Sequence, residues 1–243
     1  SGWLQNIPKL PSQQMSNPIY EAALRLRLFQ RAPQALPGMH CDCHVPGGAH
    51  PTLDIRGHHL AFGCGVGGRR HNTHDALVHE FDAILRYCGH WTKREERGAF
   101  HAHDPDSDLR PDITVYNPAN TTATKVILDV TVKTTLSSFR HGGFHDIPVG
   151  ELDREDVGKA ANTAFLQKKA KYQGVCDACG FSFIPLIFES TGFMHSGVNA
   201  YLRSLAAHCC STVKKISSEI LYNHFFKRVT LSIACMVSTA SGM

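Results

Sequence analysis

Two aspartates, Asp112 and Asp129, are the residues of this sequence best suited to chemistry. Asp112 opens the apolar run 113–116, and Asp129 lies inside the apolar run 125–132. Both runs are rich in β-branched residues and a turn-like Asn-Pro-Ala-Asn-Thr-Thr segment joins them, so they predict a β-hairpin. A carboxylate inside a strand costs free energy unless a charge or a metal ion pairs with it. The two carboxylates therefore predict a Mg²⁺ site that activates water for phosphodiester hydrolysis.

A third carboxylate would complete this metal site. Glu80, at the border of a predicted apolar helix face, is the first candidate, and Glu95 and Glu96 compete with it. An alternative interpretation needs no metal ion. Asp112 is then a turn residue that follows a proline, and Asp129 faces solvent on an alternating strand.

A lysine on a predicted helix is the candidate partner of the two aspartates. Lys168 falls on the apolar stripe of that helix, and Lys171 lies one turn later. A lysine at such a position either reaches past the apolar surface to solvent or points at negative charge. Beside a metal ion and a phosphate, it would orient the attacking water and stabilise the transition state. Lys133, at the end of the second strand, is the alternative lysine.

Residues 31–70 carry a second candidate metal site. The segment is rich in Gly, Pro, His and Cys and lacks a hydrophobic period, so it cannot form its own apolar core. Two close thiolates, followed by a His and a Cys five residues apart, predict a tetrahedral Zn²⁺ site that orders the segment. The predicted ligands are Cys41, Cys43, His59 and Cys64, with His58 as the alternative to His59. A further CxxC pair, Cys176 and Cys179, has no second pair and is expected in packing.

A basic stretch precedes the first helix of the predicted core. Backbone N–H groups at a helix N-terminus attract phosphate, so this stretch is a candidate nucleic-acid contact, with a solvated basic patch as the alternative. Its residues are Arg69, Arg70, His71 and Asn72.

The order of the predicted elements defines an α/β protein. The patterns predict a helix at 18–30, a helix capped by Asn72 or Thr73 and running to about Cys88, the hairpin, a helix at 151–174, a strand at 181–189, and helices at 196–210 and 212–237. The expected buried faces are Leu77, Phe81, Ile84, Leu85 and Cys88 on the second helix, and Val157, Ala161, Ala164, Phe165 and Tyr172 on the third. Pro185 predicts a sheet edge or a bulge. Residues 89–109 are charged and irregular, and no strand is visible there.

Composition sets the protein class without deciding the function. The chain has 243 residues, a net charge of +4 and 42% hydrophobic residues, which fits a globular protein that can bind nucleic acid but is not compelled to. It has no signal-peptide pattern and no apolar run long enough to span a membrane. Nine Cys and 16 His without a secretion signal favour metal ligation in a reducing intracellular compartment over a disulfide scaffold.

Taken together, these motifs resemble the restriction-like endonuclease region that follows the reverse transcriptase of eukaryotic non-LTR retrotransposons, a nuclease of the PD-(D/E)XK type. The resemblance covers about residues 2–205 and rests on the order of the motifs: the zinc knuckle, Arg70-His71-Asn72, Pro111-Asp112 with Asp129, and Lys168 with Lys171 and Tyr172. The sequence departs from the usual pattern at Thr131, where such nucleases have a lysine, and the retrotransposon version moves that lysine to the following helix.

The resemblance implies a domain order and a function. Residues 1–35 would form a linker with a helix, 36–70 the zinc knuckle, 71–195 a restriction-like nuclease core, and 196–243 C-terminal helices. The protein would be a nuclear endonuclease that uses Mg²⁺ and a structural Zn²⁺ to nick target DNA, so that the freed 3′ end primes reverse transcription. Its partners would be DNA, with element RNA as an open alternative, and it would be part of a reverse-transcriptase polyprotein.

Two other functions are compatible with the sequence. The first is a zinc-stabilised nucleic-acid-binding module whose active site has decayed. The second is a zinc-dependent hydrolase that uses the His-rich segment, which is less favoured because the chain has no HExxH helix.

Overall fold

The computed structural model describes residues 69–116, 118, 123–133, 158–189, 192–212 and 216–240. The predicted helix at 18–30 and the predicted zinc ligands lie outside these residues. Within them, the chain forms an α/β unit whose elements are α3 (Arg69–Tyr87), β1 (Trp91–Arg94), β2 (Ile113–Tyr116), β3 (Lys125–Lys133), α4 (Lys159–Ala178), β4 (Ser182–Glu189), α5 (Ser196–Thr212) and α6 (Ser218–Ala240). None of the helices in these ranges has the length and hydropathy of a membrane span.

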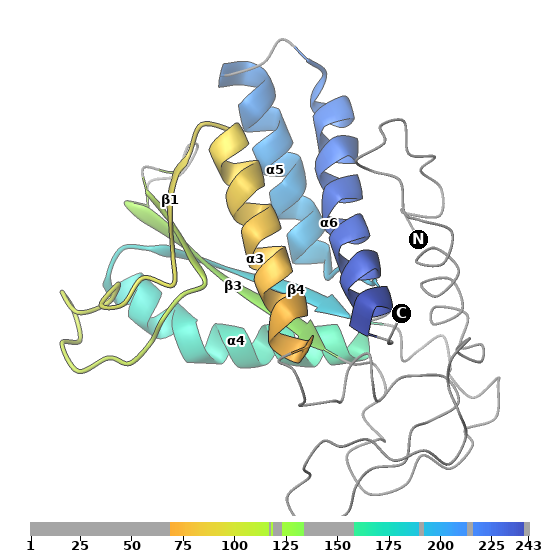
Figure 1. Cartoon of the computed structure of the whole chain (residues 1–243). Helices are drawn as coiled ribbons and strands as arrows, with labels where there is room; N and C mark the ends of the chain where they lie inside the picture. The colour runs from red at the N-terminus through yellow and green to blue at the C-terminus, as the bar shows by residue number, and fades with distance from the viewer. Residues whose placement is uncertain are drawn as a thin grey trace, which may run out of the picture.

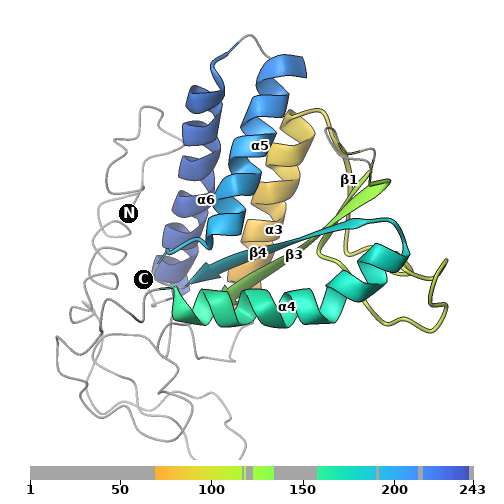
Figure 2. The ribbon, with the colours of Figure 1, turned by 180° about the vertical axis from the view of Figure 1, so that it is seen from behind.

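The strands form one four-stranded mixed sheet in the order β1-β2-β3-β4. β2 is antiparallel to both β1 and β3, which confirms the predicted hairpin, and β4 is parallel to β3. A parallel pair needs a long crossover connection, and α4 lies within it. Figures 1 and 2 show α4 on one side of the sheet and α3, α5 and α6 side by side on the other.

The alternation of side chains along β3 divides the core between these two faces. Val126, Leu128 and Val130 pack with α3, α5 and α6 in the larger apolar cluster. Ile127 packs on the opposite face with Tyr172 of α4, and Asp129 follows two residues later on that same face. One of the two candidate acids is therefore buried in the layer between the sheet and α4.

The predicted apolar stripes of the helices are confirmed. All five residues expected on the buried face of α3 are fully buried, from Leu77 to Cys88. On α4, Ala161, Ala164 and Tyr172 are buried and Phe165 is partly buried against them, whereas Val157 lies outside the described residues. Pro185 lies in β4, at an edge of the described sheet, as expected.

The predicted element boundaries need correction at several places. α3 begins at Arg69, not at a cap formed by Asn72 or Thr73. α4 begins at Lys159 because Gly158 has a left-handed φ of 85°, which ends any helix arriving from earlier residues, and it continues to Ala178. α5 (Ser196–Thr212) begins at the predicted residue and ends slightly later, whereas α6 (Ser218–Ala240) both begins and ends later than predicted.

The main correction concerns residues 89–109, which were expected to be irregular but contain strand β1. Only Thr92 of its four residues is buried, so the strand has no hydrophobic alternation to reveal it. The Thr92 hydroxyl donates a hydrogen bond to the buried carboxylate of Asp82 in α3. Arg86 also bonds Asp82, at 3.1 Å, and reaches the Thr92 carbonyl at 3.3 Å. Polar contacts with α3, and not an apolar stripe, therefore fix the position of this strand.

Candidate active site

Asp112 lies directly before β2, and Asp129 lies inside the adjacent strand β3. Lys168 of α4 contacts Asp129, whereas His74 contacts Asp112 from α3, on the other side of the sheet. Burial raises the pKa of the Tyr172 hydroxyl and both negative charges raise it further, so the two acids share its surroundings. The Asp129 side chain is only 5% exposed and that of Asp112 is half-buried. The hairpin therefore brings two largely dehydrated carboxylates together.

Lys168 of α4 reaches one of the two carboxylates, that of Asp129. Its Nζ lies 2.6 Å from Oδ2 of Asp129, and the Thr131 hydroxyl donates to the same oxygen at 3.2 Å. Lys171 lies instead over the ring of Tyr172, with Nζ 5.0 Å from the ring centroid. Lys133, the alternative lysine, ends β3 opposite Glu189. The helical stripe therefore delivers one lysine to the pair, and that lysine is Lys168.

Tyr172 closes the site from the side of α4. Its hydroxyl donates to the carbonyl oxygen of Arg110 at 3.3 Å. Burial raises the pKa of this phenol well above its ordinary value, and the negative charge of Asp129 raises it further. Tyr172 is therefore a neutral hydrogen-bond donor at this site, packed beneath the segment that leads to Asp112.

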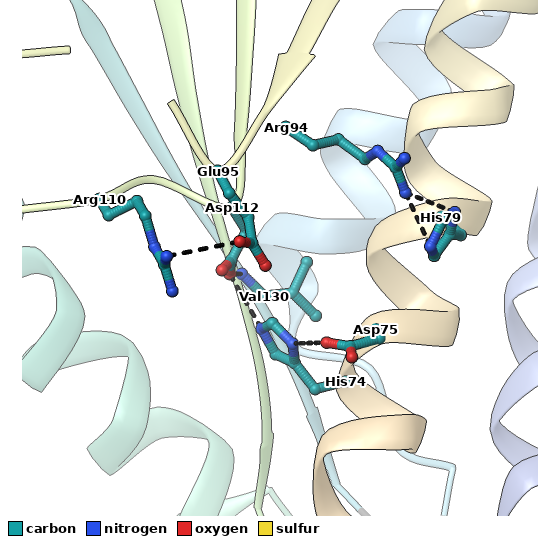
Figure 3. A network of polar contacts seen from close by, with 8 residues as sticks. All are labelled: His74, Asp75, His79, Arg94, Glu95, Arg110, Asp112 and Val130. Atoms are coloured by element: carbon teal, nitrogen blue, oxygen red, sulfur yellow. Dashed lines mark hydrogen bonds and ion pairs between the residues drawn. The ribbon is translucent and has the colours of Figure 1, made fainter. Parts of the chain in front are cut away.

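His74 of α3 is the site residue that sequence reasoning missed. Its Nε2 lies 3.1 Å from Oδ2 of Asp112, and its Nδ1 lies 3.0 Å from Oδ1 of Asp75, so the ring bridges two carboxylates (Figure 3). The hydrogen bond to Asp112 raises the pKa of His74 to about 9, although burial acts in the opposite direction. A signal was present, because His74 precedes Leu77 by three residues and Val78 by four and so extends the buried stripe of α3.

Asp112 is also fixed by the backbone of its neighbours. The amide of Val130 donates to Oδ2 of Asp112 at 2.6 Å. The amide of Glu95 donates to the carbonyl of Asp112 at 3.0 Å, just after β1 ends. Glu95 is a non-glycine residue with a positive φ of 47°, and its side chain pairs with Arg110 at 3.5 Å beside Asp112 (Figure 3).

The three glutamates proposed as a third metal ligand have different surroundings. Glu80 forms an ion pair with Arg228 of α6, so its side chain is engaged in the helical layer. Glu96 is buried and accepts hydrogen bonds from the Tyr116 hydroxyl and from Lys93. Glu95 is the one that neighbours Asp112. Within the described ranges, no three His, Cys, Asp or Glu side chains are grouped as a metal site.

Several predicted site residues fall outside the described part of the chain. These are the zinc ligands Cys41, Cys43, His59 and Cys64, and the side chains of Arg69, Arg70, His71 and Asn72. The CxxC pair of α4 has the expected packing role, because Cys176 is buried in the cluster under the sheet and Cys179 packs against it. Burial raises the pKa of the Cys176 thiol to about 12.

Comparison of the chain with models of known protein families gives no match, and comparison with curated proteins gives none either. The function is therefore argued from the geometry of the site itself.

Proposed function

We propose that this protein is a metal-dependent nuclease whose active site contains Asp112, Asp129 and Lys168. The observation that carries the proposal is the contact of 2.6 Å between Lys168 and Asp129, because it joins a helix to a strand residue whose neighbour, Val130, bonds a second acid, Asp112. Two acids that hold a metal ion and a lysine that stabilises charge are groups that can catalyse phosphodiester hydrolysis. The order of helix, three antiparallel strands, helix and parallel strand supports a restriction-like core.

The two aspartates are suited to hold a Mg²⁺ ion. Both are oxygen donors, and Asp112 accepts a hydrogen bond from the amide of Val130, the residue after Asp129. Because Mg²⁺ commonly keeps several waters and uses only one or two carboxylates, two protein ligands are enough for it. Such an ion, when bound, lowers the pKa of water and neutralises charge on the phosphate. Glu95, beside Asp112, is the candidate for an additional ligand.

Lys168 would act on the phosphate and on the attacking water. Its ammonium pairs with Asp129 and lies 6.0 Å from the centroid of the Tyr172 ring. The position two residues after Asp129 is Thr131, which carries no charge. Lys168 therefore supplies from the helix the positive charge that this strand position lacks.

His74 would act as a positioning residue for Asp112. The imidazole and the Val130 amide both contact Oδ2 of Asp112, so they would hold that carboxylate in one orientation when it binds a metal ion. Hydrogen bonds to a ligating carboxylate fix its orientation and typically change metal affinity or activity 10- to 100-fold, on the order of other outer-sphere contacts.

The substrate and the biological setting follow from the resemblance. The nuclease would cut DNA within a retroelement polyprotein, in the nucleus, and the nick would prime reverse transcription. A structural Zn²⁺ held by Cys41, Cys43, His59 and Cys64 is part of the same proposal.

A nicking assay tests the proposed function. Supercoiled plasmid incubated with the protein and Mg²⁺ is expected to relax to the open circle, and Asp112→Ala is expected to abolish this. Asp106→Ala is the matched control, since Asp106 is an exposed acid in the preceding segment. If the wild-type protein binds DNA but leaves the plasmid intact with Mg²⁺ or Mn²⁺, the decayed binding module is the correct function.

A further inference from the structure

Trp91 is a large aromatic residue that the fold leaves in solvent. Its side chain is 65% exposed on the edge strand β1, whereas most of the described aromatic residues contribute to the core. Trp91 pairs in register with Tyr116 of β2, and the two ring centroids lie 4.4 Å apart with 33° between the ring planes. One face of the indole is therefore supported by a second ring, which holds the other face at the surface.

The same line of residues continues across the sheet. Tyr116 pairs in register with Lys125 of β3, whose Nζ lies 4.8 Å from the centroid of the Tyr116 ring. That ammonium also lies 5.1 Å from the centroid of the Phe181 ring, just before β4. Trp91, Tyr116, Lys125 and Phe181 thus form one row, which we term the aromatic row, with one residue from each of four neighbouring segments of the sheet.

The aromatic row lies on the same face of the sheet as the candidate active site. Lys125 and Asp129 are four residues apart on β3, and residues separated by an even number share a face. At about 3.3 Å per residue, the two positions are about 13 Å apart along the strand. A nucleic-acid strand that passes along this face can therefore contact both.

The chemistry of the row matches one class of ligand. Flat, exposed rings stack on bases, and a neighbouring ammonium attracts a phosphate. Glu96, which accepts a hydrogen bond from Tyr116 and one from Lys93, is buried, so its charge is paired and withdrawn from the surface beside the row. Bases in a duplex are already stacked on one another, so rings of this kind select bases that are unpaired.

We propose that the aromatic row binds unpaired bases of a DNA strand next to the phosphate that the active site cleaves. The inference rests on the proposed function for the identity of the partner. It goes further by defining the substrate as DNA that carries a single-stranded segment, with Trp91 as the stacking residue and Lys125 as the phosphate contact.

The test measures binding without cleavage. Fluorescence anisotropy of a labelled oligothymidylate, in EDTA, gives the affinity for single strands, and a duplex of equal length gives the reference. Trp91→Ala is expected to weaken single-strand binding about tenfold while duplex binding changes little. Trp91→Phe, which keeps a ring, is expected to recover most of the affinity. Lys125→Met is expected to reduce the slope of log affinity against log salt concentration by the amount that about one phosphate contact contributes.

Leu166→Ala is the matched control, since Leu166 is 66% exposed on α4 but carries no ring, and its affinity should equal that of the wild type. The proposal is overturned if Trp91→Ala binds single strands as well as the wild type, or if it loses duplex binding equally. It is also overturned if the substitution alters the oligomeric state or the unfolding temperature in place of the affinity. Single-strand binding with no plasmid nicking would keep this inference and remove the proposed nuclease.

Discussion

Two ion pairs on opposite sides of the sheet have similar burial and different surroundings. Lys168 and Asp129, 26% and 5% exposed, lie between the sheet and α4 among other charged and polar groups. Arg228 and Glu80, 29% and 19% exposed, join α6 to α3 above an apolar layer. The first pair lies near further charged groups, Asp112 and His74, whereas the second links two helices. Under the proposed function, the first pair would serve the chemistry and the second would serve the packing.

The largest expected effect is the loss of nicking when the charge of Lys168, in the first pair, is removed. Lys168→Met keeps the apolar stem and removes the ammonium, so nicking should fall about 10²-fold or more while Mg²⁺ binding persists. It also leaves the buried Asp129 without its cation, so the metal-free protein should unfold at a lower temperature and Mg²⁺ should restore much of the loss. Initial nicking rates and thermal unfolding with and without Mg²⁺ measure both effects.

Lys169→Met is the matched control for that change. Lys169 is the next residue of α4, and its Nζ lies 5.6 Å from the centroid of the Phe165 ring, not at the carboxylates. Lys169 is half-buried, as Lys168 is, but it does not contact the carboxylates, so the nicking rate of this variant should remain within about twofold of the wild type. Equal losses in the two variants would assign Lys168 to general DNA attraction.

The second expected effect concerns His74. His74→Ala removes the contact that fixes Asp112, so the Mg²⁺ concentration needed for half-maximal nicking should rise about 10- to 100-fold. His74→Gln, which keeps a hydrogen-bond donor of similar length, should recover part of that loss. A Mg²⁺ titration of the nicking rate separates this effect from a fall in the maximal rate. A lower maximal rate with an unchanged Mg²⁺ requirement would show that His74 does not position a metal ligand.

The third prediction concerns the second ion pair, Glu80 with Arg228, where a substitution should change the stability and leave nicking unchanged. Glu80→Gln removes one charge of the α3–α6 pair, so the free energy of unfolding should fall by about 1–2 kcal/mol, while nicking at a permissive temperature stays unchanged. Glu219→Gln is the control, because its pair with Arg203 at 3.3 Å is well exposed and should contribute less than about 1 kcal/mol. Denaturant unfolding measures both. If Glu80→Gln loses nicking but keeps its stability, Glu80 would be assigned as a ligand of the metal ion and not as a packing residue.

The smallest effect should be a loss of stability at acid pH that comes from protonation of His90. Burial lowers the pKa of His90 below its ordinary value of 6.5, and the ring of His208, stacked at 4.9 Å, lowers it further. The unfolded chain therefore binds a proton more readily than the folded one, so the stability that His90 contributes is complete above about pH 6.5 and is lost as the pH falls below it. Thermal unfolding of His90→Gln should show a weaker acid dependence than the wild type, and an equal dependence would exclude His90 as its source.

The parts of the site that the sequence predicted are those with a local periodic signal. Lys168 was found because it falls on the apolar stripe of its own helix, and Asp129 because it interrupts an apolar strand. The placement of Asp112 beside the strand of Asp129 followed from the hairpin, since strand pairs joined by a short turn are adjacent. Local periodicity is therefore sufficient to place the three residues near one another.

The parts that the sequence did not predict depend on contacts between distant segments. Glu80 looked like a border residue of an apolar helix face, but its partner Arg228 comes from the last helix. β1 has no apolar alternation, and Thr92 is held by Asp82 of a different element. His74 extends the stripe of α3 by one turn, but its role depends on Asp112, which arrives 38 residues later. No pattern within a single element contains these pairings.

Because α4 lies in the crossover between β3 and β4, the candidate site is expected to form in two separate stages of folding. The hairpin alone brings the two acids together, whereas Lys168 arrives only when α4 docks on the sheet and β4 pairs in parallel with β3. Local contacts close at lower entropic cost than distant ones, so the acids should meet before the lysine joins them during folding. By the same reasoning, a transient opening of α4 would switch off the site while the hairpin stayed intact, because helix and hairpin belong to separable units of local unfolding.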